Sequence, residues 1–260
     1  MANSEHLGIF CQGAKAWNTW RESNPEKIPD LSGAYIGCMG LADSCNDNDG
    51  SVDIAYDFEE DEVDLRRLNL SRANMKGCHL EVLDLSEANL SYADLSQSQF
   101  LCSVDFTKAN FFKANLVDAD FSLGVLMEGL FFQASLTQAN FTDANLTGAL
   151  LSAADLEDAS LVRANLSNTN LVGANFRNAN LEEANLYEAD LRGADFTGAI
   201  LKKANLNKAL TRGNTNFVNM GIFDLSSLNR SHVIFKNADL RNATLIDVDL
   251  SEANLNGAIF

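Results

Sequence analysis

Hydrophobic residues return every five positions through the middle of the chain. From Phe106 to Leu206 every fifth residue is Leu or Phe, in 21 repeats of 21, and Ala stands two positions earlier in 17 of them. Asn or Asp commonly lies between the two, and the other positions are mostly polar. Side chains five apart lie on opposite faces of a continuous strand, and on a helix they diverge by about 140°. The pattern therefore predicts a chain that bends once in every repeat.

Bends near a right angle would close one coil after four repeats. Such coils would stack with a rise of about 4.8 Å each, with the Leu or Phe and the small residue pointing inward and the other positions facing water. The aromatic residues agree, because several are spaced by one coil and would stack ring on ring: Phe111 with Phe131, Phe121 with Phe141, and Phe176 with Phe196. We predict an all-β solenoid, a four-sided parallel β-helix.

The repeats also carry a family resemblance. Segments such as Ala114-Asn115-Leu116 and Ala184-Asn185-Leu186 resemble the pentapeptide-repeat family, whose motif is A-[DN]-L-x-x. The resemblance covers residues 29–260 and implies a right-handed quadrilateral parallel β-helix of about ten coils. It also implies a protein that acts by presenting a surface and not by catalysis.

Residues 1–28 lack the five-residue period. Phe10, Trp17 and Trp20 have near-helical spacing, and Pro25 would end a helix. A coil stack exposes its interior and unpaired backbone at each end, so we expect a short N-terminal capping helix. The alternative is a helix that binds a partner. Residues 16–34 resemble the cap of bacterial family members, which are numerous in photosynthetic lineages.

An acidic insertion interrupts the repeats early in the chain. Residues 43–64 hold ten carboxylates and no Lys or Arg, and apolar residues alternate within them as in a short strand. We expect this insertion to lie on the coil surface, with contacts from Tyr56, Phe58, Glu59 and Glu60.

No motif of the sequence indicates catalysis or a bound cofactor. The three histidines are far apart, and we find no Gly-rich phosphate loop or nucleophile elbow. The segment Asp47-Asn48-Asp49-Gly50 resembles part of a calcium loop, but an EF-hand aligned on its Gly would place Cys45 and Tyr56 at ligand positions. We therefore predict a protein that is not an enzyme and has no metal or cofactor.

The sequence also indicates the cellular compartment of the protein. Five scattered cysteines favour a reducing compartment over a disulfide framework. The sequence contains no apolar run long enough for a membrane span and no signal peptide at its start, so we expect a cytoplasmic protein.

Residues 123–132, together with Phe112, form the candidate interaction surface. There the outward positions are apolar: Leu123, Val125, Met127 and Leu130. Phe112 and Phe132 each follow a core Phe one coil apart, so both should project from the same wall as an exposed aromatic pair. This surface would bind a protein partner or, alternatively, be covered by the acidic insertion.

The preferred function is a non-enzymatic scaffold that binds an as yet unknown protein. The alternative is an acidic DNA mimic, since some acidic members of the family bind and protect DNA gyrase. The net charge of −17 suits that reading, but residues 43–64 supply −10 of it and leave −7 for the other residues. Direct binding of nucleic acid is disfavoured by the charge. The final residues, Ala258-Ile259-Phe260, suggest an uncapped coil and therefore a homodimer through the C-terminal coil.

Overall fold

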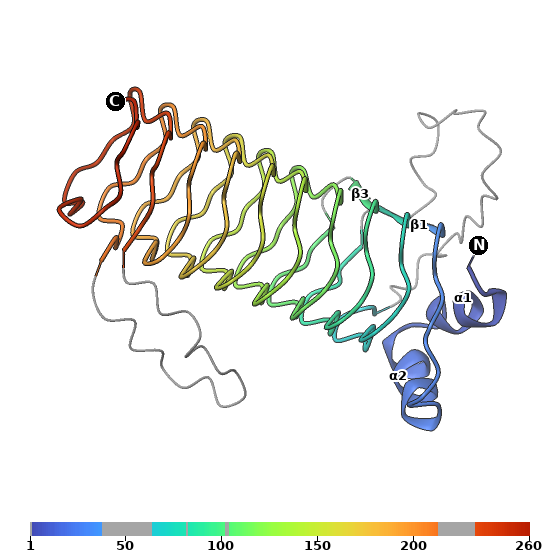
Figure 1. Cartoon of the computed structure of the whole chain (residues 1–260). Coiled ribbons are helices and arrows are strands. Elements are labelled where there is room, and N and C mark those ends of the chain that lie inside the picture. Colours follow the sequence, from blue (N-terminus) through green and yellow to red (C-terminus); the bar gives the residue numbers. More distant parts are fainter. Residues whose placement is uncertain (1, 38–63, 82, 102–103, 213–231) are drawn as a thin grey trace, which may run out of the picture.

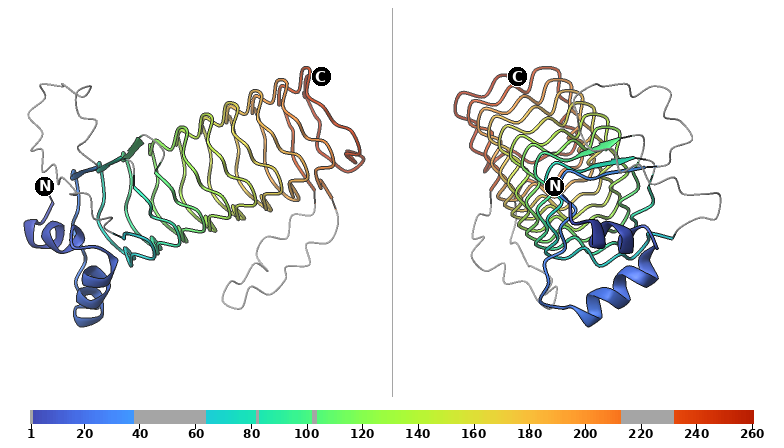
Figure 2. Two further views of the ribbon diagram at one scale, coloured as in Figure 1. Left: turned by 180° about the vertical axis from the view of Figure 1, so that it is seen from behind. Right: turned by 90° about the vertical axis from the view of Figure 1, so that its right-hand side faces the viewer.

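The chain forms a long stack of coils with two helices at its N-terminal end (Figures 1 and 2). This computed structural model describes residues 2–37, 64–81, 83–101, 104–212 and 232–260. Most of the acidic insertion, including Tyr56, Phe58, Glu59 and Glu60, lies outside the described residues.

Parallel backbone pairing joins each coil to the next. Leu126 N–H donates to the Asn145 carbonyl at 2.8 Å, and Asn145 N–H donates back to the Gly124 carbonyl at 2.9 Å. Most walls pair through single bridges of this kind. On one wall the pairing lengthens into three parallel strands in the order β1-β2-β3: β1 (Tyr35–Gly37), β2 (His79–Glu81) and β3 (Gln99–Leu101). The predicted parallel coil is confirmed, whereas its handedness and number of coils stay predictions.

Each coil has four walls, and each wall contributes one buried Leu or Phe to the interior. We name the walls after their core residues in one coil: the Phe106, Phe111, Leu116 and Phe121 walls. These side chains are 0% exposed, as are most of their counterparts in neighbouring coils.

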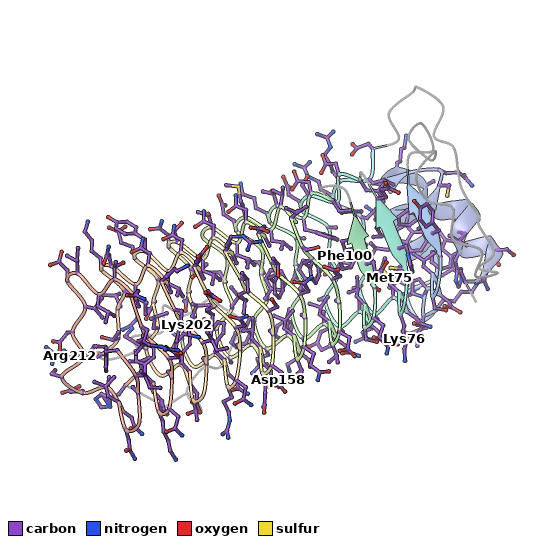
Figure 3. All side chains as sticks on the ribbon, turned by 90° about the horizontal axis from the view of Figure 1, so that it is seen from above. Met75, Lys76, Phe100, Asp158, Lys202 and Arg212 are labelled. Carbon is purple, nitrogen blue, oxygen red and sulfur yellow. The ribbon has the colours of Figure 1, made fainter. Side chains whose placement is uncertain are left out.

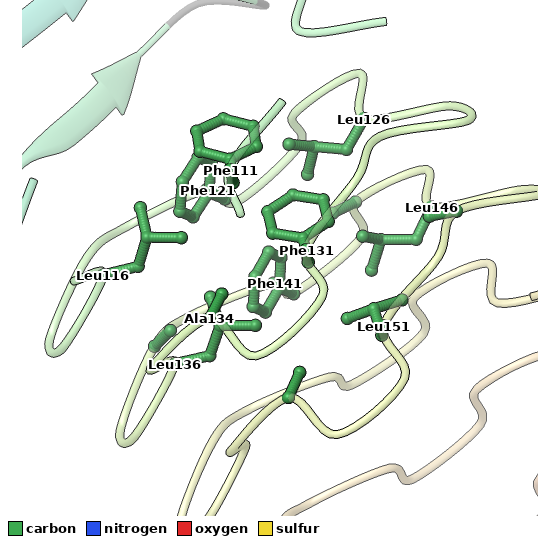
Figure 4. Packing of buried hydrophobic residues seen from close by; sticks show 14 of the residues in the cluster. Phe111, Leu116, Phe121, Leu126, Phe131, Ala134, Leu136, Phe141, Leu146 and Leu151 are labelled. Atoms are coloured by element: carbon green, nitrogen blue, oxygen red, sulfur yellow. The ribbon is translucent and has the colours of Figure 1, made fainter. Parts of the chain in front are cut away.

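The predicted aromatic stacking is confirmed (Figure 4). The ring centroids of Phe111 and Phe131 are 4.6 Å apart, with 8° between the ring planes. Phe121 and Phe141 stack at 5.2 Å and 4°, and the Phe176–Phe196 pair at 4.7 Å and 4°. Each buried ring adds roughly 1.5–3 kcal/mol of hydrophobic stabilisation.

A tight turn forms each corner between two walls. Ala139 N–H donates to the carbonyl of the core residue Leu136 at 3.0 Å. Between them, Gln138 has a φ of 61°, which is the conformation that a type II turn requires at its third residue. The same positive φ recurs two residues after most core residues. Outside Gly and Asn, few residues adopt this conformation readily.

Two helices cap the first coils, where we expected one. They are α1 (Ser4–Phe10) and α2 (Ala14–Ser23). The expectation of a single helix was wrong because Gly13, with a φ of 88° and a ψ of 177°, takes a conformation that suits Gly and ends the helical path. Phe10 and Trp17 therefore meet across the two helices, at 5.6 Å between ring centroids.

Helix α2 replaces the missing coil beneath the Phe111 wall. In later coils the residue before the core position bonds through both its N–H and its carbonyl to the preceding coil. At Asn69 these two bonds are made instead by α2. Its carbonyl accepts from Trp17 Nε1 at 2.7 Å, and its N–H donates to Asn18 Oδ1 at 2.8 Å. The carbonyl of Ser71 accepts from Arg21 Nη2 at 3.2 Å.

Helix α1 serves the first repeat of the Leu116 wall in the same way. Asn3 N–H donates to the Asp30 carbonyl at 2.9 Å, and Asp30 N–H donates to His6 Nδ1 at 3.0 Å. The described helices thus satisfy backbone groups that would otherwise be exposed at a sheet edge.

Removing the Trp17 side chain should destabilise the cap strongly. Trp17 is 0% exposed, so Trp17→Ala should lower the free energy of unfolding by about 3–5 kcal/mol, through a cavity and the lost bond to Asn69. Thr19→Ala, on the exposed side of α2, should change it by less than about 0.5 kcal/mol. Urea unfolding followed by circular dichroism measures both, and equal effects would contradict the role given to Trp17.

The corner conformation should be sensitive to side-chain branching. Gln138→Val places a β-branched residue at positive φ. We expect it to lower the free energy of unfolding by about 1–2 kcal/mol. Two controls should change the free energy of unfolding by less than about 0.5 kcal/mol. They are Thr137→Val, one residue earlier, and Gln138→Gly. Urea unfolding measures all three variants. If Gln138→Val were as stable as Gln138→Gly, the type II turn conformation assigned to this corner would be wrong.

Candidate functional site

The six predicted surface residues lie on two adjacent walls. Phe112, Leu130 and Phe132 belong to the Phe111 wall, where the two aromatic rings stack at 5.8 Å with 1° between their planes. Val125 and Met127 belong to the Phe106 wall, since their carbonyls accept from Phe106 and Lys108. Leu123 lies at the corner before that wall. The structure therefore divides the predicted surface into two parts.

The expected exposed aromatic pair is wrong for Phe132. Its side chain is buried, with 8% of the residue exposed, whereas Phe112 is half-buried. Phe112 covers one face of the Phe132 ring, so counting outward positions overestimated its exposure.

Other apolar residues of the Phe111 wall were missed in the sequence. Leu150 pairs with Leu130 across one coil, and Val172 lies two coils beyond Phe132, with 3% exposed. Both follow the 20-residue spacing that linked Phe112 to Phe132, so that period could have revealed them. Tyr92 packs edge-on against Phe112 at 5.3 Å.

Leu123 differs from the residues above it at the same corner. It is 65% exposed and has a φ of 61°. The corresponding positions of the next coils hold charged residues that form ion pairs: Asp143, Arg163, Glu183 and Lys203. With the half-buried Val125 and Met127 beside it, Leu123 forms an apolar patch, here called the Leu123 patch.

Ion pairs join adjacent coils at some of the corners. Arg163 Nε donates to Asp143 Oδ1 at 2.7 Å, and Lys203 Nζ to Glu183 Oε1 at 2.6 Å. The hydrogen bond from Arg163 lowers the pKa of Asp143. Charged side chains such as Lys76 and Asp158 project from the outside of the coils (Figure 3). Because these pairs are exposed, each adds little to stability.

The described residues offer no catalytic or metal-binding cluster. No group of three His, Cys, Asp or Glu side chains within them could hold a metal ion. Cys78 is fully buried, and burial raises the pKa of its thiol to about 12. Its Sγ donates to Ser98 Oγ at 3.4 Å, so it is an inert interior residue. None of the described helices has the length and apolarity that crossing a membrane requires.

Comparison with solved structures returns pentapeptide-repeat proteins. HetL, involved in heterocyst differentiation regulation in the cyanobacterium Nostoc sp. strain PCC 7120, is 22% identical over 93% of this chain and 92% of its own, with a TM-score of 0.37. Rfr23 from the cyanobacterium Cyanothece 51142 is 29% identical over 48% of this chain and 63% of its own, with a TM-score of 0.29. QnrB1, a plasmid-mediated fluoroquinolone resistance protein, is 22% identical over 72% and 81%, with a TM-score of 0.31.

The family assignment rests on the repeats themselves, because these TM-scores are low. No curated protein matched the chain. The model of pentapeptide repeats matches eight copies, over residues 64–100, 131–168, 159–198, 174–210 and 231–260. These matches span more than half of the sequence, and the chain therefore belongs to the pentapeptide-repeat family.

Proposed function

We propose that this chain is a non-enzymatic protein that binds another protein through the Leu123 patch on its coil stack. The observation that carries the proposal is the environment of Leu123. A large apolar side chain is 65% exposed at a corner where the following coils carry ion-paired residues. Its left-handed backbone costs roughly 1 kcal/mol, and its exposed side chain contributes little to the core. The left-handed backbone is shared by most corners, so the exposed apolar side chain is what sets Leu123 apart, and exposed apolar patches often mark binding sites.

The coil stack gives such a patch a fixed geometry. The backbone groups on both sides of Leu123 are held by hydrogen bonds to the next coil, from Leu123 N–H to the Thr142 carbonyl and from Leu126 N–H to the Asn145 carbonyl. A side chain on a rigid support loses little entropy on binding, which favours affinity from a small contact.

The alternative function, an acidic mimic of DNA that binds gyrase, has weaker support. Such a mimic needs unpaired carboxylates spread along the rod. Here Glu87, Asp143 and Glu183 each pair with a cation of the neighbouring coil. Most of the net charge comes instead from the acidic insertion.

Partner capture should depend on the Leu123 patch. The full chain, immobilised and incubated with a lysate of the native organism, should retain a protein that Leu123→Asn/Met127→Thr fails to retain. Asn suits the left-handed corner, so the variant should fold normally. Lys203→Asn changes the same corner at a φ of 57° and serves as the control. Binding of the purified partner should weaken at least about tenfold in the patch variant, and unchanged binding would refute the site.

The Phe111 wall should respond differently. Phe112→Ser/Phe132→Ser separates the two readings of the aromatic pair, because internal packing predicts lost stability and a partner contact predicts lost binding alone. Since Phe132 is 8% exposed, we expect the free energy of unfolding to fall by about 3 kcal/mol. If the double variant were fully stable but no longer captured the partner, these rings would belong to the binding surface.

We also propose that a second copy pairs with the last described coil. Leu245, Leu250 and Leu255 are only partly buried, whereas Phe235 and Leu240 of the preceding coil are 0% and 2% exposed. Parallel pairing of the kind that joins the coils would seat a second copy on this coil.

Sedimentation should detect this dimer at tens of micromolar protein. Phe260→Asp, at a residue of this coil that is 61% exposed, should shift the protein to monomer because it would bury a charge at the junction. Ile246→Asp removes a side wall residue that is 64% exposed and should leave the dimer intact. A parent protein that sediments only as monomer would contradict the proposal.

A further inference from the structure

One corner of the coil stack, near the N-terminal end, carries cations that form no ion pair with any described residue. It lies between the Phe111 and Leu116 walls. Its successive coils present Ile28, Arg72, Tyr92 and Lys113, which we call the cationic corner.

Backbone hydrogen bonds establish this alignment. Asn74 N–H donates to the Pro29 carbonyl at 2.7 Å, which places Ile28 beneath Arg72. Arg72 N–H donates to the Ser91 carbonyl at 2.9 Å, and Tyr92 N–H to the Phe112 carbonyl at 2.8 Å. The four residues thus follow one another at about 4.8 Å per coil.

The column alternates exposed apolar and exposed cationic side chains. Ile28 is 65% exposed and Tyr92 50%, and Arg72 and Lys113 are also exposed. Lys113 Nζ lies 5.9 Å from the centroid of the Tyr92 ring and 5.2 Å from that of Phe112. Tyrosine and arginine are enriched at the energetic centres of protein interfaces.

The cap adds two more cations at the foot of the column. Lys27, beside Ile28, holds its Nζ 5.9 Å from the centroid of the Trp20 ring. Arg21 is buried and donates from Nη1 to the Lys27 carbonyl at 2.7 Å and from Nη2 to the Ser71 carbonyl at 3.2 Å. Burial and the nearby charge of Arg72 both lower the pKa of Arg21. Lys27, Arg21 and Arg72 therefore lie near one another at the foot of the column.

Other corners of the rod follow a different rule. At two of them, the described cations two residues after a core position pair with a carboxylate one coil away: Arg67 with Glu87, Lys108 with Glu128, Arg163 with Asp143, Lys203 with Glu183, and Lys208 with Glu188. At the cationic corner Tyr92 stands where such a carboxylate would be. Among the ion pairs of the described residues, none includes Lys27, Arg72 or Lys113.

We propose that the cationic corner docks an acidic polypeptide segment in which apolar residues alternate with carboxylates. The carboxylates would pair with Arg72 and Lys113, and the apolar side chains would cover Ile28 and Tyr92. The alternation of exposed apolar and cationic side chains favours a short acidic segment with apolar residues, because such a partner needs only a local surface of complementary charge. This surface is separate from the Leu123 patch, which lies at the opposite corner of the coil.

A peptide of the required pattern can be taken from the sequence of the chain itself. Residues 52–62 read Val-Asp-Ile-Ala-Tyr-Asp-Phe-Glu-Glu-Asp-Glu. A fluorescein-labelled peptide of this sequence, titrated with the full chain at low salt, should bind and raise the fluorescence anisotropy. Binding should weaken at high salt, and a peptide with its carboxylates replaced by amides should not bind.

Variants with matched charge locate the binding. Arg72→Asn/Lys113→Asn should weaken binding by about tenfold or more, because two charge-assisted contacts are lost. Lys203→Asn/Lys208→Asn removes the same charge at corners with similar φ values, 57° and 58° against 59° and 53°, and should change affinity by less than about twofold. Tyr92→Asn should weaken binding without altering the charge.

Thermal unfolding of each variant verifies that the fold is intact, since Asn tolerates the left-handed corner. Absence of peptide binding by the parent chain would overturn the proposal, including the case in which another segment of the chain already occupies the corner. Equal losses in the two double variants would overturn it as well, because they would show a response to net charge alone.

Discussion

Hydrogen bonding between coils is the interaction on which the whole molecule depends. Within a repeat the chain makes one backbone bond of its own, across the corner, as from Ala139 to Leu136. The N–H after the core residue donates to the Asn or Asp side chain before it, as from Thr142 to Asn140 Oδ1 at 3.0 Å. Most of the other N–H and carbonyl groups of each wall find partners in the coils above and below. A single coil could therefore satisfy neither its backbone nor its apolar interior, and stability grows only as neighbours are added.

This dependence explains the chemistry of the N-terminal cap. A buried backbone group without a partner costs about 1–3 kcal/mol, so the first coil needs a substitute for its missing neighbour. Trp17, Asn18 and Arg21 lie on one side of α2, where the helical repeat brings them together. Their side chains meet the backbone of Asn69 and Ser71 with the polarity that a preceding coil would present.

In such a regular rod, the residues proposed to bind partners are those that depart from the repeat. Outward positions are filled mainly by polar residues, and some of these form ion pairs between coils. An exposed apolar side chain at such a position is therefore easily recognised. Leu123 interrupts a charged corner, and Tyr92 separates two cations that elsewhere would face a carboxylate. Both are exposed, and neither is explained by packing of the core. Each such side chain has a defined position on the surface, because hydrogen bonds to the coils on either side hold the backbone beneath it.

The sequence by itself determined the coil, the buried rows and the stacked phenylalanines, because a strict period decides which side chains share an interior. It also brought Phe112 and Phe132 to one wall, since no residue is inserted between them. Only the tertiary structure decided the burial of Phe132, the break between the two helices and the cationic corner. Ile28 and Arg72 are separated by the acidic insertion, and Tyr92 and Lys113 by one residue more than a coil. Counting fails across such interruptions, and only the hydrogen-bond register between coils places these residues in one column.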